Sequence, residues 1–106
     1  MKHEVLLLRK AATDFDTIVG FLQPHSPASA ARWCEAFEKA LAHLEKNPQQ
    51  FALAPENDEF PFTIRQISFK TKRGRTYRVV YTIVGHQVRV LRVLGPAHDL
   101  LKEDDL

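Results

Sequence analysis

The order of hydrophobic patterns along the chain predicts an α+β fold. An apolar run at residues 3–8 precedes two segments whose apolar residues recur every three or four positions, and three runs rich in Val, Ile and Tyr follow. At 106 residues, 44% apolar and 26% charged, the chain has the size of one globular domain covering residues 1–106. We therefore expect an N-terminal strand, an antiparallel helical hairpin and a three-stranded antiparallel meander, forming one mainly antiparallel sheet covered by the helices.

Residues 11–22 predict an amphipathic helix, because their apolar side chains share one face: Ala12, Phe15, Ile18, Val19 and Leu22. Pro24 is expected to end this helix. Ser26 and Pro27 predict the start of a second helix, since Ser accepts from a free backbone N–H and Pro at the first helical position loses no hydrogen bond. This second helix should end before Asn47.

The second predicted helix also carries an apolar stripe: Ala30, Trp33, Cys34, Phe37, Leu41 and Leu44. The spacing of this stripe favours packing of Trp33 and Phe37 in the core over base stacking. The same holds for Tyr77 and Tyr81, which lie on the core face of a predicted strand. Cys34 lacks a neighbour that would activate it, so we expect a buried thiol. Few residues separate the two helices, which predicts an antiparallel hairpin.

Residues 48–63 contain three prolines and a run of acidic and amide side chains, which predict a surface loop. Strands are expected at 64–70, 77–84 and 87–94, and Gly85-His86 suits a type II′ turn between the last two. That turn places Val84 opposite Gln87, and this register predicts four pairs on one face: Ile83–Val88, Tyr81–Val90, Val79–Arg92 and Tyr77–Leu94. We expect this face to pack on the helices and the opposite face to be exposed until a partner covers it.

Basic residues are concentrated in one part of the chain. Residues 60–98 contain eight Lys or Arg and no Asp or Glu, so this segment carries +8, whereas the rest carries −6 and the whole chain +2. A local positive field of this size suits RNA, DNA or an acidic protein. A solvated basic face without a ligand is the alternative, because charge alone does not identify a partner.

No pattern in the sequence predicts a metal, a cofactor or a membrane span. The single cysteine cannot form an internal disulfide, and no His/Cys grouping has the spacing of a zinc site. The apolar run at residues 5–8 is too short for a signal peptide or a membrane helix. We expect a cytoplasmic protein without a cofactor.

Several segments, taken in order, resemble the ParE/RelE superfamily of bacterial toxins. They are the Ala-x-x-Asp-Phe-Asp start of the first predicted helix, then SPASAARWCEAFEKALAHLEKNPQQF, IRQI, YRVVYTI and VRVLRVLGPAHD. The resemblance covers nearly the full chain. It implies a toxin of a type II toxin–antitoxin pair, held inactive by a cognate antitoxin whose extended C-terminal segment wraps the toxin. The basic, half-apolar sheet face predicted above suits an acidic, amphipathic peptide in that role.

The resemblance leaves the mode of action open. ParE-like members poison DNA gyrase, whereas RelE-like members are ribosome-dependent mRNA endoribonucleases that use no metal. The GPAHD ending, and the lack of Tyr after Tyr81 and of Arg after Arg92, favour the ParE-like (plasmid stabilisation) branch. We therefore expect growth inhibition by binding a macromolecular target, with mRNA cleavage as the alternative. A third possibility is a degenerate member that serves only as an interaction module or as a repressor partner at its own promoter.

The nuclease alternative would place Arg78 and His98 in catalysis. Metal-independent RNA cleavage needs cations at the phosphate and a proton carrier, and both residues match positions that RelE-like enzymes use. The competing interpretation is that Arg78 anchors a carboxylate of the antitoxin or of the chain's own acidic tail, and that His98 is structural or contacts the antitoxin.

The other predicted site residues are binding residues. Antitoxin binding is expected on the exposed sheet face, at Arg78, Val80, Arg89, Leu91 and Val93. Target or nucleic-acid binding is expected at basic residues that suit phosphates: Arg65, Lys70, Lys72, Arg73, Arg75, Arg78 and Arg89. The cluster between residues 70 and 75 is equally compatible with a solubilising turn.

Overall fold

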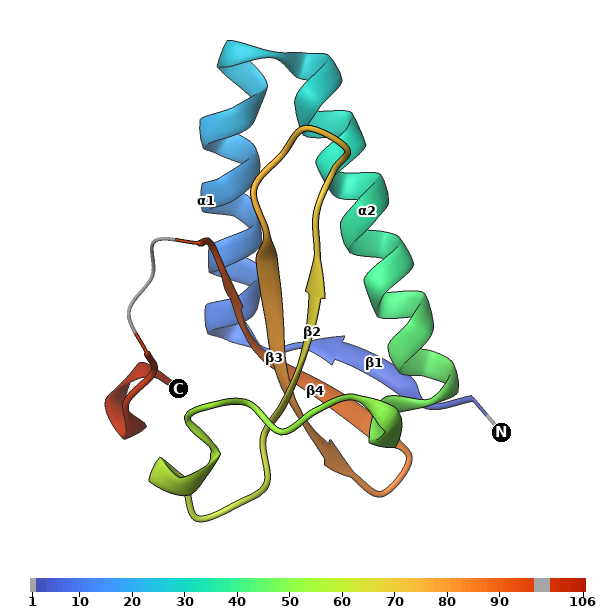
Figure 1. Cartoon of the computed structure of the whole chain (residues 1–106), viewed down its shortest axis with the longest axis vertical. Coiled ribbons are helices and arrows are strands. Elements are labelled where there is room, and N and C mark those ends of the chain that lie inside the picture. The colour runs from blue at the N-terminus through green and yellow to red at the C-terminus, as the bar shows by residue number, and fades with distance from the viewer. Residues whose placement is uncertain (1, 97–99) are drawn as a thin grey trace.

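The computed structural model describes residues 2–96 and 100–106, and its elements follow the predicted order (Figure 1). They are β1 (Glu4–Leu7), α1 (Arg9–His25), α2 (Pro27–Lys46), β2 (Arg65–Phe69), β3 (Tyr77–Val84) and β4 (Gln87–Leu94). Short 3-10 turns lie at Pro48–Gln50, Asn57–Glu59 and Glu103–Asp105.

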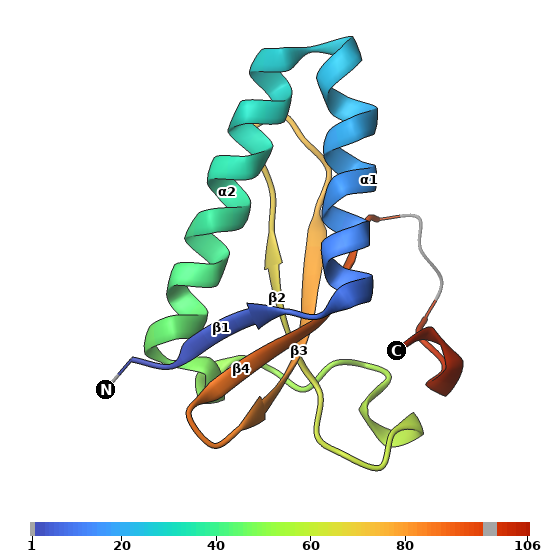
Figure 2. The ribbon, with the colours of Figure 1, turned by 180° about the vertical axis from the view of Figure 1, so that it is seen from behind.

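The strands form one sheet in the order β1-β4-β3-β2. The last three strands form the predicted antiparallel meander, and β1 pairs with β4 in parallel, so the sheet is mixed. Figure 2 shows α1 and α2 side by side on one face of this sheet. The α+β prediction is confirmed, including the pairing of the first strand with one of the last three.

The helix boundaries follow from local hydrogen bonds. In α2, the Ser26 hydroxyl accepts from the Ser29 N–H at 3.2 Å, as expected of an N-cap. The prediction that Pro24 ends α1 is wrong, because the helix continues through His25. Pro24 lies in the last turn, where its missing N–H costs only one helical hydrogen bond, and the N–H of Ser26 still bonds to the Leu22 carbonyl.

The main core lies between the helices and the sheet. It contains the predicted aromatic residues of α2, with the Trp33 and Phe37 rings stacked at 5.5 Å between centroids. Tyr81 is fully buried, and its hydroxyl donates to the Pro48 carbonyl at 2.6 Å. Burial raises the pKa of Tyr81 to about 12, although the nearby Arg65 charge works in the opposite direction. The hydroxyl therefore stays protonated and donates, which fixes the 3-10 turn after α2 against β3.

The β3–β4 register is correct near the turn and wrong beyond it. Gly85 has φ 60° and no described non-glycine residue has positive φ, which fits a type II′ turn. The predicted pairs hold from Val84–Gln87 to Tyr81–Val90. A β-bulge then adds Leu91 to β4, so the predicted pairs beyond it are replaced by Val80–Arg92, Val79–Val93 and Arg78–Leu94. The bulge brings Val93 to the helix-facing core and Leu94 to the opposite face.

The face of the sheet away from the helices, called the outer face here, has a core of its own. It consists of Ala54, Phe60, Ile64, Val80, Leu91, Leu94 and Leu101. Residues 52–64, called the covering segment here, fold back over the sheet through backbone bonds from Ala54 to Ile64 and from Gln66 to Ala52. The C-terminal residues lie beside this segment (Figure 1). The prediction of an exposed outer face is therefore wrong for the part that these two segments cover.

Candidate binding surfaces

Arg78 lies on the outer face of β3, and its guanidinium is held by internal partners. Its Nη1 is 2.9 Å from Glu56 Oε1 and 2.9 Å from Gln66 Oε1, and its Nη2 bonds to Glu56 Oε2. The Glu56 side chain is only 1% exposed. The N–H of Leu101 donates to the same carboxylate at 2.9 Å, so the covering segment, β3 and the C-terminal residues meet at one ion pair.

The charge state of this pair follows from its contacts. Burial opposes ionisation of Glu56, but hydrogen bonds from Arg78 and from backbone N–H groups, with the Arg78 charge, outweigh it and hold the pKa of Glu56 below its ordinary value. Glu56 is thus ionised at neutral pH and compensates the Arg78 charge. The sequence left two roles open for Arg78, binding a phosphate in catalysis or pairing with a carboxylate. In the structure Arg78 pairs with a carboxylate of its own chain, which comes from the covering segment and not from the acidic tail.

A second ion pair accounts for Arg92. Its Nε is 2.7 Å from Asp14 Oδ2 and its Nη2 is 2.9 Å from Asp14 Oδ1, and the N–H of Val93 also donates to Asp14. The hydrogen bonds to Asp14 raise the pKa of Arg92 above its ordinary value. This pair joins α1 to β4 next to the bulge. Nothing in the sequence predicts this pair, because Asp14 and Arg92 are 78 residues apart and meet only when α1 packs beside β4.

The predicted antitoxin surface is largely inside the molecule. Val80 and Val93 are buried in the two cores, and Leu91 is 8% exposed. The prediction that these three side chains are exposed is wrong. Residues 52–64 and Leu101 cover Val80 and Leu91, and the bulge turns Val93 toward the helices. Arg89 remains half-exposed, with its Nε 3.1 Å from Gln87 Oε1.

Part of the outer face stays uncovered next to the β3–β4 turn. A groove of about 590 Å³ lies there, with Arg65 and Arg89 among its lining residues and Leu91 at its base. Three exposed apolar side chains also line it, Leu8, Phe62 and Val84, and the exposed Leu6 lies beside it, opposite Arg89 in the β1–β4 pairing. We call these four residues and Arg89 the sheet-end patch. Clustered exposed apolar side chains beside a cation are typical of a protein-binding surface.

The sequence did not single out three of these residues, Leu6, Leu8 and Phe62. The short run containing the two leucines reads as a buried strand, and only its pairing with β4 at the edge of the sheet leaves alternate side chains exposed. Arg65, predicted as a target contact, donates to the Phe51 carbonyl at 2.7 Å and is half-buried. It therefore fixes the loop after α2 as well as lining the groove.

A second groove, the loop groove, lies between the tip of the helical hairpin and the β2–β3 loop. Its volume is about 1140 Å³, and its lining includes Lys72, Arg73 and Arg75 of the loop. Arg32 and Trp33 of α2 and Phe21 of α1 complete it, and these three were not predicted as site residues. Lys70 lies just before the loop and is exposed. Three of the four predicted loop cations thus share one groove.

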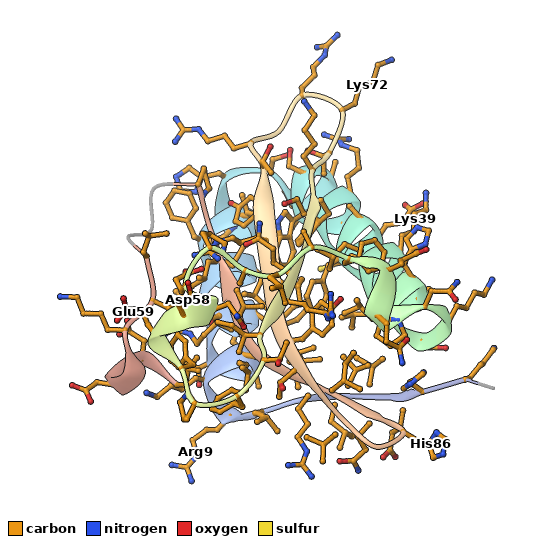
Figure 3. All side chains as sticks on the ribbon, turned by 60° about the horizontal axis from the view of Figure 1, so that its bottom comes forward. Arg9, Lys39, Asp58, Glu59, Lys72 and His86 are labelled. Carbon is orange, nitrogen blue, oxygen red and sulfur yellow. The ribbon has the colours of Figure 1, made fainter. Side chains whose placement is uncertain are left out.

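The two surfaces lie at opposite ends of the molecule. Figure 3 shows Lys72 at the tip of the β2–β3 loop and His86 in the β3–β4 turn at the other end. The acidic side chains of Asp58 and Glu59 lie to one side, next to the C-terminal residues (Figure 3). Two partners can therefore be bound without competing for the same residues. The remaining candidate, His98, lies outside the described residues.

Two further observations concern the described part of the chain. No helix there combines the length and the apolar character that crossing a membrane requires. Nor do the described His, Cys, Asp and Glu side chains form a group of three or more that could hold a metal ion.

Comparison with known proteins agrees with this architecture. Residues 5–100 match the family described as the ParE toxin of the type II toxin–antitoxin system parDE. A solved structure titled chromosomal ParDE TA system from P. aeruginosa is similar, with a TM-score of 0.67 and 21% identity over 89% of this chain and 96% of that one. A search of curated proteins found no match. Since the family match covers most of the chain, this protein belongs to the ParE toxin family of type II toxin–antitoxin systems.

Proposed function

We propose that this protein inhibits growth by binding a macromolecular target, DNA gyrase, and that a cognate antitoxin neutralises it in the cytoplasm. The observation that carries this proposal over RNA cleavage is the state of Arg78. Its charge is already compensated by a buried carboxylate, so it is not free to stabilise a phosphate. The two accessible candidate surfaces, the sheet-end patch and the loop groove, suit binding of a partner.

We assign the antitoxin to the sheet-end patch. Its exposed apolar side chains offer burial to an amphipathic segment, and Arg89 offers attraction to an acidic one. Of the earlier candidates, Arg89 remains in this assignment, whereas Arg78, Val80, Leu91 and Val93 leave it because they are buried or paired.

We assign the target to the opposite end, where Lys70, Lys72, Arg73 and Arg75 are all exposed. A cationic loop that projects from the body of the molecule can reach into a cleft of a large enzyme (Figure 3). Its charge also speeds the encounter with an anionic surface.

Expression of the toxin without its antitoxin tests the mode of action. We expect growth arrest with DNA breaks and intact mRNA, relieved in cells whose gyrase carries resistance substitutions. Codon-positioned mRNA cuts with intact DNA would contradict the gyrase proposal and support the nuclease. Normal growth despite accumulation of folded protein would contradict both.

Reciprocal substitutions test the assignment of the two surfaces. Phe62→Asp in the sheet-end patch should weaken antitoxin binding and leave toxicity in place, because an exposed apolar contact becomes a charge of the wrong sign. Phe21→Asp, also at an exposed Phe but beside the loop groove, should weaken toxicity and leave antitoxin binding in place. Each variant serves as the control for the other, and equal effects on both properties would contradict the assignment.

A further inference from the structure

The loop groove combines uncompensated positive charge with an apolar interior. Arg32 hydrogen-bonds to Ser29 in the preceding turn of α2. Within the described residues, Lys72, Arg73 and Arg75 have no ion-pair partner, and no Asp or Glu lines the groove. Four like charges around one groove repel each other until an anion binds among them.

The floor of the groove contains a buried donor. Trp33 lines the groove with only 3% of its surface exposed, and its indole Nε1 has no hydrogen-bond partner among the described residues. A buried N–H without an acceptor is costly, so an occupant that brings an oxygen atom to this position gains from it. Leu22 and Tyr77 extend the apolar floor, and Phe21 stands at its edge with 67% of its surface exposed.

These features fit a protein segment better than a nucleic acid. Single strands bind by stacking bases on exposed aromatic faces, and of the aromatic lining residues only Phe21 is exposed, since Trp33 is buried and Tyr77 half-buried. A DNA duplex contacts cations through its phosphates and would leave the apolar floor unfilled.

We propose that the loop groove binds an acidic peptide segment that also carries apolar side chains. Its carboxylates lie at Arg32 and the loop cations, its apolar side chains fill the floor, and one of its oxygens accepts from Trp33 Nε1. The identity of the partner rests on the proposed function. The peptide segment belongs to the target protein, so the groove contacts that protein and not the DNA that it holds.

The chain reports on this groove by itself, because Trp33 is its only tryptophan. Its fluorescence is titrated with three ligands: a short Glu-rich peptide containing Leu and Phe, the same peptide with Ser at the apolar positions, and an oligothymidylate of equal charge. We expect the first to change the emission and to bind at least about tenfold tighter than the others, because it alone fills the floor. Tighter binding of the oligothymidylate, or no change with any peptide, would overturn the proposal.

Charge reversal separates the groove from general attraction. Arg32→Glu with Arg75→Glu should weaken binding of the acidic, apolar peptide about tenfold or more. Lys2→Glu with Arg9→Glu makes the same change in net charge at exposed residues outside the groove lining and should leave the affinity within about twofold. Equal losses in both variants would overturn the proposal. Trp33→Phe, measured with a labelled peptide, should weaken binding about threefold through loss of the indole donor.

The growth assay distinguishes failure of this inference from failure of the proposed function. A wild-type protein that binds the peptide but does not arrest growth contradicts the target assignment and leaves the groove ligand standing. A protein that arrests growth but shows no peptide binding contradicts the groove ligand alone. Growth arrest that is lost with Arg32→Glu and Arg75→Glu but retained with Lys2→Glu and Arg9→Glu supports both the groove ligand and the target assignment.

Discussion

At the residue scale, Arg78 shows that one side chain suits two roles until its neighbours are known. An arginine on a central strand fits a phosphate and a carboxylate equally well. Glu56 and Leu101, which decide between them, lie 22 and 23 residues away on either side in the chain. Their meeting depends on the folding of two irregular segments over the sheet. Arg78 therefore stabilises the fold.

The first prediction concerns the buried carboxylate. Glu56→Gln keeps the shape of the side chain but leaves the Arg78 guanidinium without its counter-charge, so we expect the free energy of unfolding to fall by about 3 kcal/mol. Urea unfolding measures the loss. Glu59→Gln, at an exposed position of the same segment, is the control and should change stability by less than about 0.5 kcal/mol. Equal losses in the two variants would show that the ion pair is not the cause.

The second prediction is the pH dependence of the same pair. The folded-state pKa of Glu56 lies below the unfolded value of 4.5, so its contribution is fully present above 4.5 and is lost as pH falls through the folded pKa. The difference in unfolding free energy between wild type and Glu56→Gln should stay constant near neutral pH and shrink below 4.5. Urea titrations over this range test the trend, and a difference that does not change on acidification would contradict it.

At the scale of elements, local chemistry explains what the sequence predicts correctly. The Gly85-His86 turn sets the first β3–β4 pairs, and Ser26-Pro27 sets the start of α2, because each depends on residues next to it. The bulge at Leu91 had no such signal. It shifts the register at the place where α1 and the covering segment pack on opposite faces of β4. These contacts form only in the folded molecule, so no local sequence pattern predicts them.

The third prediction tests one of these local signals. Ser26→Ala removes the acceptor for the Ser29 N–H at the start of α2 and should lower stability by about 1 kcal/mol. Thermal unfolding measures the change as a lower Tm. Thr17→Ala, at an exposed position inside α1, should preserve or slightly raise the Tm because alanine is the better helix former. A Tm that falls equally in both variants would exclude the cap as the explanation.

The two candidate binding surfaces were predictable from the sequence to different degrees. The loop cations are visible in the sequence because all four fall within residues 70–75 and lack acidic neighbours. Arg32, Phe21 and the unpartnered indole of Trp33 were not, since they join the same groove only when the hairpin packs beside the β2–β3 loop. The outer face was misjudged because alternation along a strand shows which residues share a face, not whether an irregular segment covers it.

At the scale of the whole molecule, the covering segment and the C-terminal residues divide one sheet face into a buried core and the exposed sheet-end patch. The C-terminal residues contribute Leu101 to this outer core, and Lys10 Nζ holds the chain end through the carbonyls of Asp104 at 3.0 Å and Leu106 at 3.3 Å. Arg92 Nη1 adds a bond to the Asp105 carbonyl. The described C-terminal residues are thus an integral part of the fold.

The fourth prediction compares two neighbouring leucines in this tail. Leu101 is 1% exposed and Leu100 is 62% exposed. Leu101→Ala leaves a cavity in the outer core and should cost about 3 kcal/mol, whereas Leu100→Ala should cost less than about 0.5 kcal/mol. Urea unfolding of both variants provides the test. Similar small losses would mean that the tail does not contribute to the core.

The parallel pairing of β1 with β4 also has a consequence for synthesis of the protein. The first strand can join the sheet only after the last one has left the ribosome, so the nascent chain spends most of translation without a complete sheet. Leu6 and Arg89, neighbours in the sheet-end patch, meet at that final step. A partner that recognises this patch therefore distinguishes a chain whose β1 and β4 have paired from every intermediate that lacks β4.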